Sequence, residues 1–436
     1  MKRFIALVLA TLLLALCACT GGKAEAPAGD APEEAIPMNE VTYPVAPAEE
    51  DIEARIQHRE DNAVTEAFLA AMETFSFRTA AQVLKNPAEN ANFSPISLYL
   101  ALALCTNGAA GETQAEMLTL MGMPDAQALT DQCARLYRLL YKDSGAGRMQ
   151  IYNSLWMDER VMGNPIKFRD AYLSSAAADY YASLFQADFA TAAAGDAMGK
   201  WVADRTHGVL TPSFPTDPER AMAILNTVYF YDEWADAFLN EDTKPGAFHA
   251  LSGDVTADFM NRVSSSGSFS RGENFTRSSL WLKNLGEMAF VLPDEGVDLS
   301  ALMQDEDALR ELFTGGTEDY GQVTWSVPKF RYGAKYDLAA ALNALGVSAA
   351  FDADKADFTG MADAPLWLSK VEQQTHIAID EKGVEAAAYT EIGLAASGIS
   401  MGRADMILDR PFLYGILSRD GTPLFIGLCA DPTAVS

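Results

Sequence analysis

The stretch from Glu381 to Met406, EKGVEAAAYTEIGLAASGISMGRADM, is a run of small or weakly polar residues just before the most hydrophobic C-terminal segments. By helix propensity, the part EAAAYTE suits an exposed alanine-rich helix. Read with a period of two, one face is instead apolar or small, at Val384, Ala386, Ala388, Thr390, Ile392, Leu394 and Ala396. The other face tolerates water. The stretch therefore suits an exposed helix, or a loop that becomes a half-buried strand, and the rest of the chain must decide.

The N-terminal segment MKRFIALVLATLLLALCACTGG has two basic residues and an apolar run too short for a comfortable membrane span. This pattern is typical of an export signal. The run Leu16-Cys17-Ala18-Cys19 resembles a bacterial lipobox, with Cys19 as the lipidated residue. We expect a signal peptide over residues 1–18 of a bacterial lipoprotein, exported and anchored to the outer face of the cell membrane or to the outer membrane. An ordinary secretory signal is the alternative.

The chain after the signal divides into an acidic segment and a large domain. Residues 19–58 are rich in Ala, Pro, Gly and Glu over most of their length, a composition that predicts a disordered tether. Residues 59–436 contain no internal repeat and no second Pro/Gly-rich linker, so we predict one domain there.

Charge and cysteine content narrow the function classes. A formal net charge of −28 argues against nucleic acid and against an anionic membrane surface as partners. Cys105, Cys133 and Cys429 lie in apolar runs, which favours buried free thiols over a disulfide framework despite the export.

Helical patterns come early and strand patterns come late. The segments VTEAFLAAMETFSFRTAAQVL and SPISLYLALALCTNGAAGETQAEMLTLMGM have helical spacing, the second with a Gly-containing break. The segments AMAILNTVYFYDEW, GEMAFVLPDE, VTWSVPKFRYG and HIAIDEKG predict strands, the first apolar on both faces and therefore central. Together they predict a large α+β domain built around a sheet.

A search for catalytic chemistry finds almost nothing. His58, His207, His249 and His376 lack metal-ligand spacing, so we expect no metal site. Asp352, Asp354 and Asp357 miss the EF-hand spacing and predict a solvated turn. Ser326 and Lys329 match the S-x-x-K pattern of penicillin-recognising enzymes, but Pro328 lies between them in a strand-like run. That arrangement would not place the two side chains one helical turn apart.

Six runs in family order nevertheless resemble the serpin family over essentially everything after the tether. These runs are NFSPISLYLALALCTNGAAGET, KWVADRTHGVL, ILNTVYFYDEWADAF with EDTKPGAFH, VPKFRYGAKYDLAAALNALGVSAAFDADKADFTGM, HIAIDEKGVEAAAYT, and DRPFLYGIL with LFIGLCADP. The resemblance implies a serpin fold with a large central, mainly antiparallel sheet, smaller sheets, about eight to nine helices and an exposed reactive-centre loop.

The resemblance also implies residue roles. The hinge, which is the part of the loop that enters the main sheet, comprises Glu381, Gly383, Val384, Glu385, Ala386, Ala387, Ala388 and Thr390. The shutter, beneath the point where strands part, comprises Ser94, Pro95, Ser97 and Asn226, and Gln373 stands where many relatives have a shutter histidine. Trp234 matches the tryptophan of the breach, where insertion begins. The charged and bulky residues of the loop then fall on its outward face.

The implied function is inhibition of a serine protease by a suicide-substrate mechanism. A protease forms an acyl-enzyme with the loop, and insertion of the cut loop deforms the protease before hydrolysis is complete. Such a protein is not an enzyme, and we expect a monomer without cofactor whose partner is the target protease. One alternative is a non-inhibitory serpin-fold surface protein. A remote alternative is a cell-wall serine hydrolase that uses Ser326 and Lys329.

The cleaved bond, called the reactive bond, is the least constrained position. Counting forward from Glu381 by the usual family spacing gives Ser397-Gly398, and counting back from Asp409 gives Ser400-Met401. Both counts fall in AASGISM, which contains no basic, acidic or aromatic residue. The resemblance and these side chains therefore favour an elastase-like or subtilisin-like target over a trypsin-like one.

Overall fold

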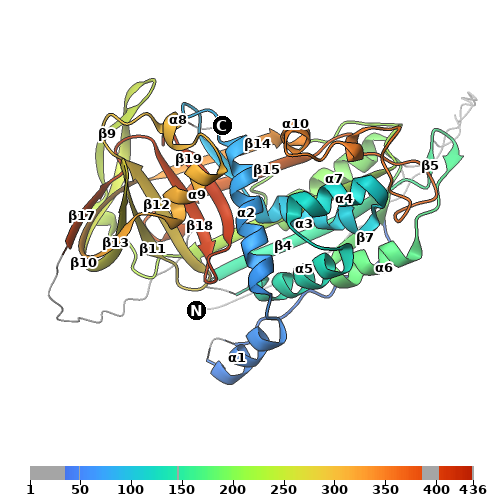
Figure 1. The fold of residues 1–436 in the computed structure, drawn as a ribbon, viewed down its shortest axis with the longest axis horizontal. Coiled ribbons are helices and arrows are strands. Elements are labelled where there is room, and N and C mark those ends of the chain that lie inside the picture. The colour runs from blue at the N-terminus through green and yellow to red at the C-terminus, as the bar shows by residue number, and fades with distance from the viewer. Residues whose placement is uncertain (1–34, 49, 145–146, 385–401, 435–436) are drawn as a thin grey trace, which may run out of the picture.

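The computed structural model describes residues 35–48, 50–144, 147–384 and 402–434. The described chain forms an α+β domain in which helices gather toward one end and a many-stranded sheet forms the other (Figure 1). The expected α+β class is confirmed.

The described residues contain ten α-helices. They are α1 (Ile52–Asp61), α2 (Glu66–Val83), α3 (Pro95–Gly108), α4 (Gly111–Met121), α5 (Ala126–Leu140), α6 (Asp170–Asp179), α7 (Ala192–Arg205), α8 (Leu299–Leu302), α9 (Glu306–Thr314) and α10 (Ala339–Ala344), with 3₁₀ turns at Asn240–Asp242 and Ala349–Phe351. We expected about eight to nine. The count is higher because α1 begins inside the predicted tether and α8 is a single turn.

Local chemistry explains the helix boundaries that matter for the site. The hydroxyl of Ser94 accepts a hydrogen bond from the backbone N–H of Ser97, and Pro95 occupies the first turn of α3. The helix ends at Gly108, where an added Cβ would overlap Met361. An apolar helix that is buried almost throughout can therefore lie between the two sheets of the molecule, in contact with β8 (Met222–Glu233) and β19 (Pro423–Cys429).

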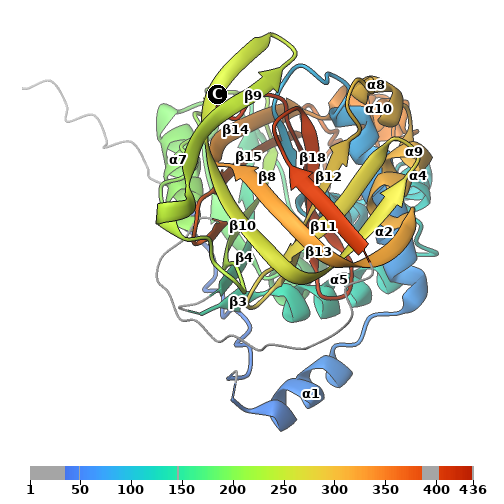
Figure 2. The same ribbon diagram turned by 90° about the vertical axis from the view of Figure 1, so that its left-hand side faces the viewer.

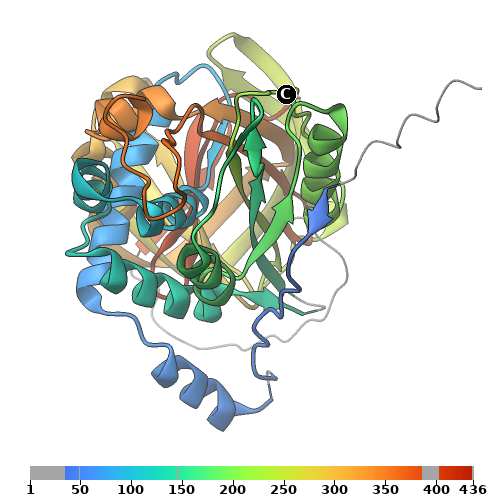
Figure 3. The same ribbon diagram turned by 90° about the vertical axis from the view of Figure 1, so that its right-hand side faces the viewer.

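The first sheet has eight strands and is mainly antiparallel, as expected. Its order is β1 (Ile36–Pro37), β7 (Ala182–Gln186), β4 (Gly147–Met157), β8 (Met222–Glu233), β16 (Gly383–Val384), β15 (Glu372–Ile379) and β14 (Phe330–Asp337), with β3 (Lys142–Asp143) beside β4. Only the β4–β7 pair is parallel among these described strands. We call this sheet the main sheet. In Figure 3, α7 lies to one side of this sheet and the other helices gather mainly on the opposite side.

The second sheet has nine strands and is larger than the smaller sheets that we expected. It runs β17 (Gly402–Ile407), β13 (Thr317–Pro328), β10 (Gly253–Gly272), β11 (Phe275–Trp281), β12 (Gly286–Pro293), β18 (Phe412–Ser418), β19 (Pro423–Cys429) and β2 (Ala91–Phe93), with β9 (Lys244–Ala250) beside β10. The reason is the 20-residue strand β10, which pairs with β9, β13 and β11 and so joins strands that would otherwise form separate sheets (Figure 2). A two-stranded ribbon, β5 (Arg160–Val161) with β6 (Asn164–Pro165), completes the strands.

The predicted disordered tether differs from the structure in its second half. Ile36 and Pro37 pair with the edge strand β7, and Asn39 both donates to the Ala182 carbonyl and accepts from the Leu184 N–H. Tyr43 then packs against other aromatic rings of the domain, and α1 follows. Amino-acid composition could not predict this ordered segment, because its order comes from the domain. The free edge of β7 supplies hydrogen-bond partners to a segment that has no core of its own.

Candidate functional site

The candidate site is the gap between β8 and β15 in the main sheet. In the described part of the chain these two strands are joined only through β16, which pairs with β8 on one side and with β15 on the other. The two residues of β16 fill only one end of the gap. The sequence predicted β8 as a central strand, and it is central in the sheet order.

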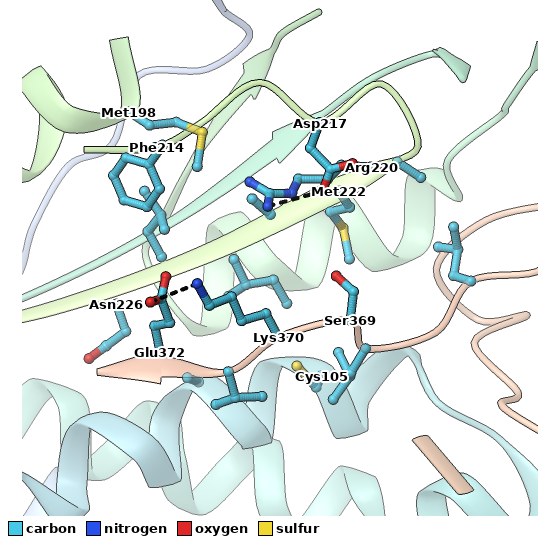
Figure 4. Close-up of a pocket in the computed structure, with 18 of the residues that line it drawn as sticks. Cys105, Met198, Phe214, Asp217, Arg220, Met222, Asn226, Ser369, Lys370 and Glu372 are labelled. Carbon is cyan, nitrogen blue, oxygen red and sulfur yellow. Dashed lines mark ion pairs between the residues drawn. The ribbon is translucent and has the colours of Figure 1, made fainter. Parts of the chain in front are cut away.

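The other end of the gap is a cavity of about 480 Å³. It lies between the Met222 end of β8 and residues 365–374, and Ala101 and Cys105 of α3 line it. Figure 4 shows Cys105 on the α3 side of the cavity. Its walls are mainly apolar, and two ion pairs lie along them, Arg220 with Asp217 at 3.2 Å and Lys370 with Glu372 at 2.8 Å. Residues 222–226 of β8 are consequently only partly buried, although their side chains are almost all apolar.

The start of the hinge, as far as Val384, lies within the described residues. Gly383 lies so close to β8 that an added Cβ would stand 2.3 Å from the Asp232 carbonyl oxygen, so close approach requires glycine here. Val384 is buried, in agreement with the inward face predicted from the period of two. The remaining predicted loop residues lie outside the described residues: Glu385, Ala386, Ala387, Ala388, Thr390, Ser397, Gly398, Ser400 and Met401.

The predicted breach residue Trp234 lies directly beside the hinge. It is 1% exposed, and its indole N–H donates to the Asp380 carbonyl at 2.9 Å while its backbone N–H donates to the Lys382 carbonyl. The indole thus contacts the segment that leads into β16. A buried tryptophan whose indole N–H is hydrogen-bonded holds the backbone in place at this end of the gap.

Glu381 is held by two side chains from other elements. Lys329 lies 2.9 Å from its carboxylate, and the Thr243 hydroxyl donates to the same carboxylate at 2.8 Å. Burial acts to raise the pKa of Glu381, but the hydrogen bonds from Lys329 and Thr243 outweigh it and hold the pKa below its usual range. The carboxylate is therefore ionised at neutral pH, and it fastens the start of the hinge to the residue before β9 and to the β13–β14 junction.

The predicted shutter residues come together at the start of α3. The side-chain amide of Gln373, on β15, accepts from the Ser94 N–H and donates to the Ser94 carbonyl. On the β8 side, the Ser97 hydroxyl donates to the amide oxygen of Asn226, whose amide nitrogen donates to Asn153 of β4. The two strands are thus connected to one helix start through different residues, with glutamine replacing the histidine of the family pattern.

The other sequence candidates take structural places. Ser326 lies in a strand that ends at Pro328, and Lys329 is engaged by Glu381, so this pair lacks the helical turn that S-x-x-K chemistry requires. His58, His207 and His249 contact a carbonyl, an amide and a carboxylate respectively. Across the described residues, no group of acidic, His and Cys side chains is arranged to hold a metal ion.

The three cysteines match the expectation of buried free thiols. Burial raises the pKa of the Cys105 thiol to about 12, so this thiol stays protonated and unreactive. None of the helices in the described part of the chain combines the length and apolar character needed to cross a membrane.

Sequence reasoning missed two sets of contacts at the site. It considered Lys329 only as a catalytic candidate, and it did not single out Asp232 or Asn284, which lie beside the hinge. Each contact joins residues about fifty positions apart, so no local spacing could have revealed it. The acidic pair Asp232-Glu233 next to Trp234, inside an apolar strand, was the one available signal.

Comparisons with known proteins agree with this geometry. The profile of the family described as Serpin (serine protease inhibitor) matches residues 70–432. Serpin B6 of Macaca fascicularis is 29% identical over 82% of this chain and 98% of its own length, and the leukocyte elastase inhibitor of Sus scrofa is 28% identical over 80% and 94%. Among solved structures, the thermophilic serpin tengpin in its native state superposes with a TM-score of 0.76 at 25% identity, covering 91% of this chain and 99% of tengpin.

Proposed function

Because the chain belongs to the serpin family, whose members are generally serine protease inhibitors, we propose that it inhibits a serine protease as a suicide substrate. The observation that carries this proposal is the half-filled gap in the main sheet. One end holds the hinge residues Gly383 and Val384 as β16, and the other end is a cavity along the same strand.

The register of β16 allows the gap to be filled by the loop itself. Val384 pairs with Asp232, and continuing that antiparallel register brings Leu394 opposite Met222 at the far end of β8. Because Val384 faces inward, Ala386, Ala388 and Thr390 would also face inward by the alternation of a strand. Small inward side chains can pass between existing neighbours, and the acidic residues remain in water.

The proposed reaction uses the serine of the protease, not a group of this chain. The protease serine attacks the carbonyl carbon of the reactive bond, the peptide bond breaks, and the released amine becomes the N-terminus of the C-terminal fragment. The N-terminal part of the loop, now an ester of the protease serine, inserts into the gap and carries the protease with it. Deformation of the protease then prevents water from completing hydrolysis, and the free energy comes from the metastable inhibitor fold.

We place the reactive bond at Ser397-Gly398, with Ser400-Met401 as second choice, and propose an elastase-like or subtilisin-like target. Shallow or small specificity pockets accept the small and aliphatic side chains of this segment, whereas a trypsin-like pocket requires Lys or Arg. One of the relatives is named a leukocyte elastase inhibitor, which supports this class of target.

The test is incubation with pancreatic elastase, subtilisin and trypsin, followed by denaturing electrophoresis and mass spectrometry of the released fragment. We expect an adduct that survives denaturation with elastase or subtilisin and little or none with trypsin. The control is Ala386→Arg, which would place an unpaired charge inside the sheet and so should be cleaved without trapping the protease. Cleavage of the unaltered protein without any adduct would favour the non-inhibitory alternative, and a fragment beginning at Ala404 would overturn the bond assignment.

We further propose that the inhibitor is a bacterial lipoprotein anchored through Cys19, because the lipobox-like sequence precedes the acidic segment. A Cys19→Ser variant should then be released from membranes and retain inhibition, since the anchor and the loop belong to separate parts of the chain. Membrane retention of the variant would contradict the anchor.

A further inference from the structure

Asp232 is a buried carboxylate at the end of β8 that the proposed mechanism does not use. Its side chain is 0% exposed. One carboxylate oxygen accepts from the Asn284 side-chain amide at 2.8 Å and from the Glu233 backbone N–H at 2.9 Å. The other oxygen accepts from the backbone N–H groups of Asn284 and Leu285, at 3.1 and 2.7 Å. An acidic group is costly in this position unless such donors meet its charge.

Three of the four donors come from residues 282–286, which comprise the turn between β11 and β12 of the nine-stranded sheet and the first residue of β12. We call this segment the 282–286 turn. It holds the end of β8 at further points, because Lys283 forms an ion pair with Glu233 at 2.6 Å and Leu282 forms an isolated bridge with Trp234. The end of β8 is therefore fastened to the second sheet as well as to its own.

Charged side chains near Asp232 come from β8, from the 282–286 turn and from β3. Glu233 follows it on β8 and pairs with Lys283. Lys142 of β3 donates to the amide oxygen of Asn284 at 3.3 Å, which orients the amide nitrogen toward Asp232. Burial raises the pKa of the Asp232 carboxyl, while hydrogen bonds from Asn284 and Leu285 act in the opposite direction.

The backbone of Asp232 lies where strand insertion would begin. It pairs with Val384 of β16 on one side and with Gly147 of β4 on the other. Gly147 also lies under the turn, since a Cβ added there would stand 2.7 Å from the Asn284 amide nitrogen. A single residue thus connects the first inserted residues, the strand that receives them and the 282–286 turn.

We propose that Asp232 is a positioning residue for loop insertion, which acts through the 282–286 turn to hold β8 in the register that receives the loop. This inference rests on the proposed function. When β8 is already fixed, it presents a regular row of backbone donors and acceptors to the cut loop. Less of the free energy gained by pairing is then spent on ordering β8. If the end of β8 is released from the turn, each step of pairing must also restore the position of β8, and insertion becomes slower.

The experiment measures insertion without requiring a trapped protease. The loop is cut with a catalytic amount of thermolysin, a zinc metalloprotease that forms no acyl-enzyme and so cannot be trapped. The protease is quenched with a metal chelator, and aliquots are heated at successive times to follow the gain of resistance to thermal aggregation. The variants are Asp232→Asn, which keeps the shape but presents N–H donors to the donors of the turn, and Asn284→Ala, which removes one donor from the same contact. The matched control is Asp158→Asn, because Asp158 is also a buried carboxylate that accepts a backbone N–H but lies at the opposite end of β4.

We expect the gain of heat resistance to slow about tenfold in Asp232→Asn, the order of effect for loss of hydrogen bonds to a charged group, and less in Asn284→Ala. The control should keep the rate of the unaltered protein even where its melting temperature falls. An unchanged rate in both test variants, or an equal slowing in the control, would overturn the positioning role. If the unaltered protein inserts but traps no protease, the proposed inhibition fails while the role of Asp232 is still measured, and absence of any gain in heat resistance would overturn both.

Discussion

The two ends of the gap between β8 and β15 are built from the same strands but in opposite ways. At the hinge end, buried charges and an indole N–H are all satisfied, through Asp232, Glu381 and Trp234. At the other end, the strands separate around a mainly apolar cavity of about 480 Å³. One end is therefore specified by directional contacts, and the other lacks the close packing that protein interiors normally reach.

Under the proposed mechanism, this difference explains how one sheet could be both specific and metastable. Hydrogen bonds and ion pairs fix the register at which a new strand must begin, because a wrong register would leave buried polar groups unpaired. The cavity leaves dispersion and apolar burial unrealised until a strand enters. Under the proposed mechanism, the hinge end would set where insertion starts, and the cavity end would supply part of the reason why it proceeds.

The largest effect is expected from filling the cavity with the chain's own loop. Cleavage within the loop should raise the midpoint of thermal unfolding by tens of degrees, because the main sheet gains a full strand and the cavity is filled. Calorimetry or circular dichroism of intact and cut protein measures the shift. Equal melting of the two forms would mean that the contrast between the two ends has no energetic consequence.

Sequence reasoning recovered the parts of this comparison that depend on local pattern. The serine and proline that begin α3, the apolar strand β8 and the inward position of Val384 all follow from capping, periodicity and alternation, and the structure agrees with them. The serpin resemblance supplied the overall fold and the placement of the shutter residues.

The remaining features depend on contacts that no local pattern encodes. Glu381 contacts Lys329 at the β13–β14 junction, and Asp232 contacts Asn284 of the second sheet's 282–286 turn, each across about fifty residues. The strand β1 forms because the edge of β7 is available, not because Ile36 and Pro37 favour a strand. The cavity arises from the separation of two strands, which is a property of the folded chain and not of any segment.

A smaller effect is expected from weakening the hinge end at Glu381. The Glu381→Gln variant keeps the hydrogen bond from Thr243 but loses the charge that pairs with Lys329, so the melting temperature of the intact form should fall by about 3 °C near neutral pH. The melting temperature of the cut form serves as the reference, since cleavage relieves the need to hold the hinge at this position.

The pH dependence of that difference follows from the lowered pKa of Glu381. A carboxyl whose pKa is lower in the folded state contributes stability that is present above its unfolded pKa and is lost as the pH falls through its folded pKa. The difference in melting temperature between the unaltered protein and Glu381→Gln should therefore shrink to zero as the pH is lowered from about 7 to below about 4. A difference in melting temperature that stays constant over this range would show that the ion pair does not stabilise the hinge end.

The smallest effect is expected from filling the cavity end with a side chain. Ala101 lies in α3 and borders the cavity, so Ala101→Leu should occupy part of the empty volume without loss of helix propensity and raise the melting temperature of the intact form by about 2 °C. In the cut form the inserted strand would compete for the same space, and the leucine should lower stability there through overpacking. The control is Ala115→Leu on the exposed surface of α4, which should change both forms equally. Measured together, the two forms of Ala101→Leu should melt closer to each other than those of the unaltered protein, because the substitution stabilises only the form in which the cavity is empty. An increase in both forms would place the substituted side chain outside the path of the inserting strand.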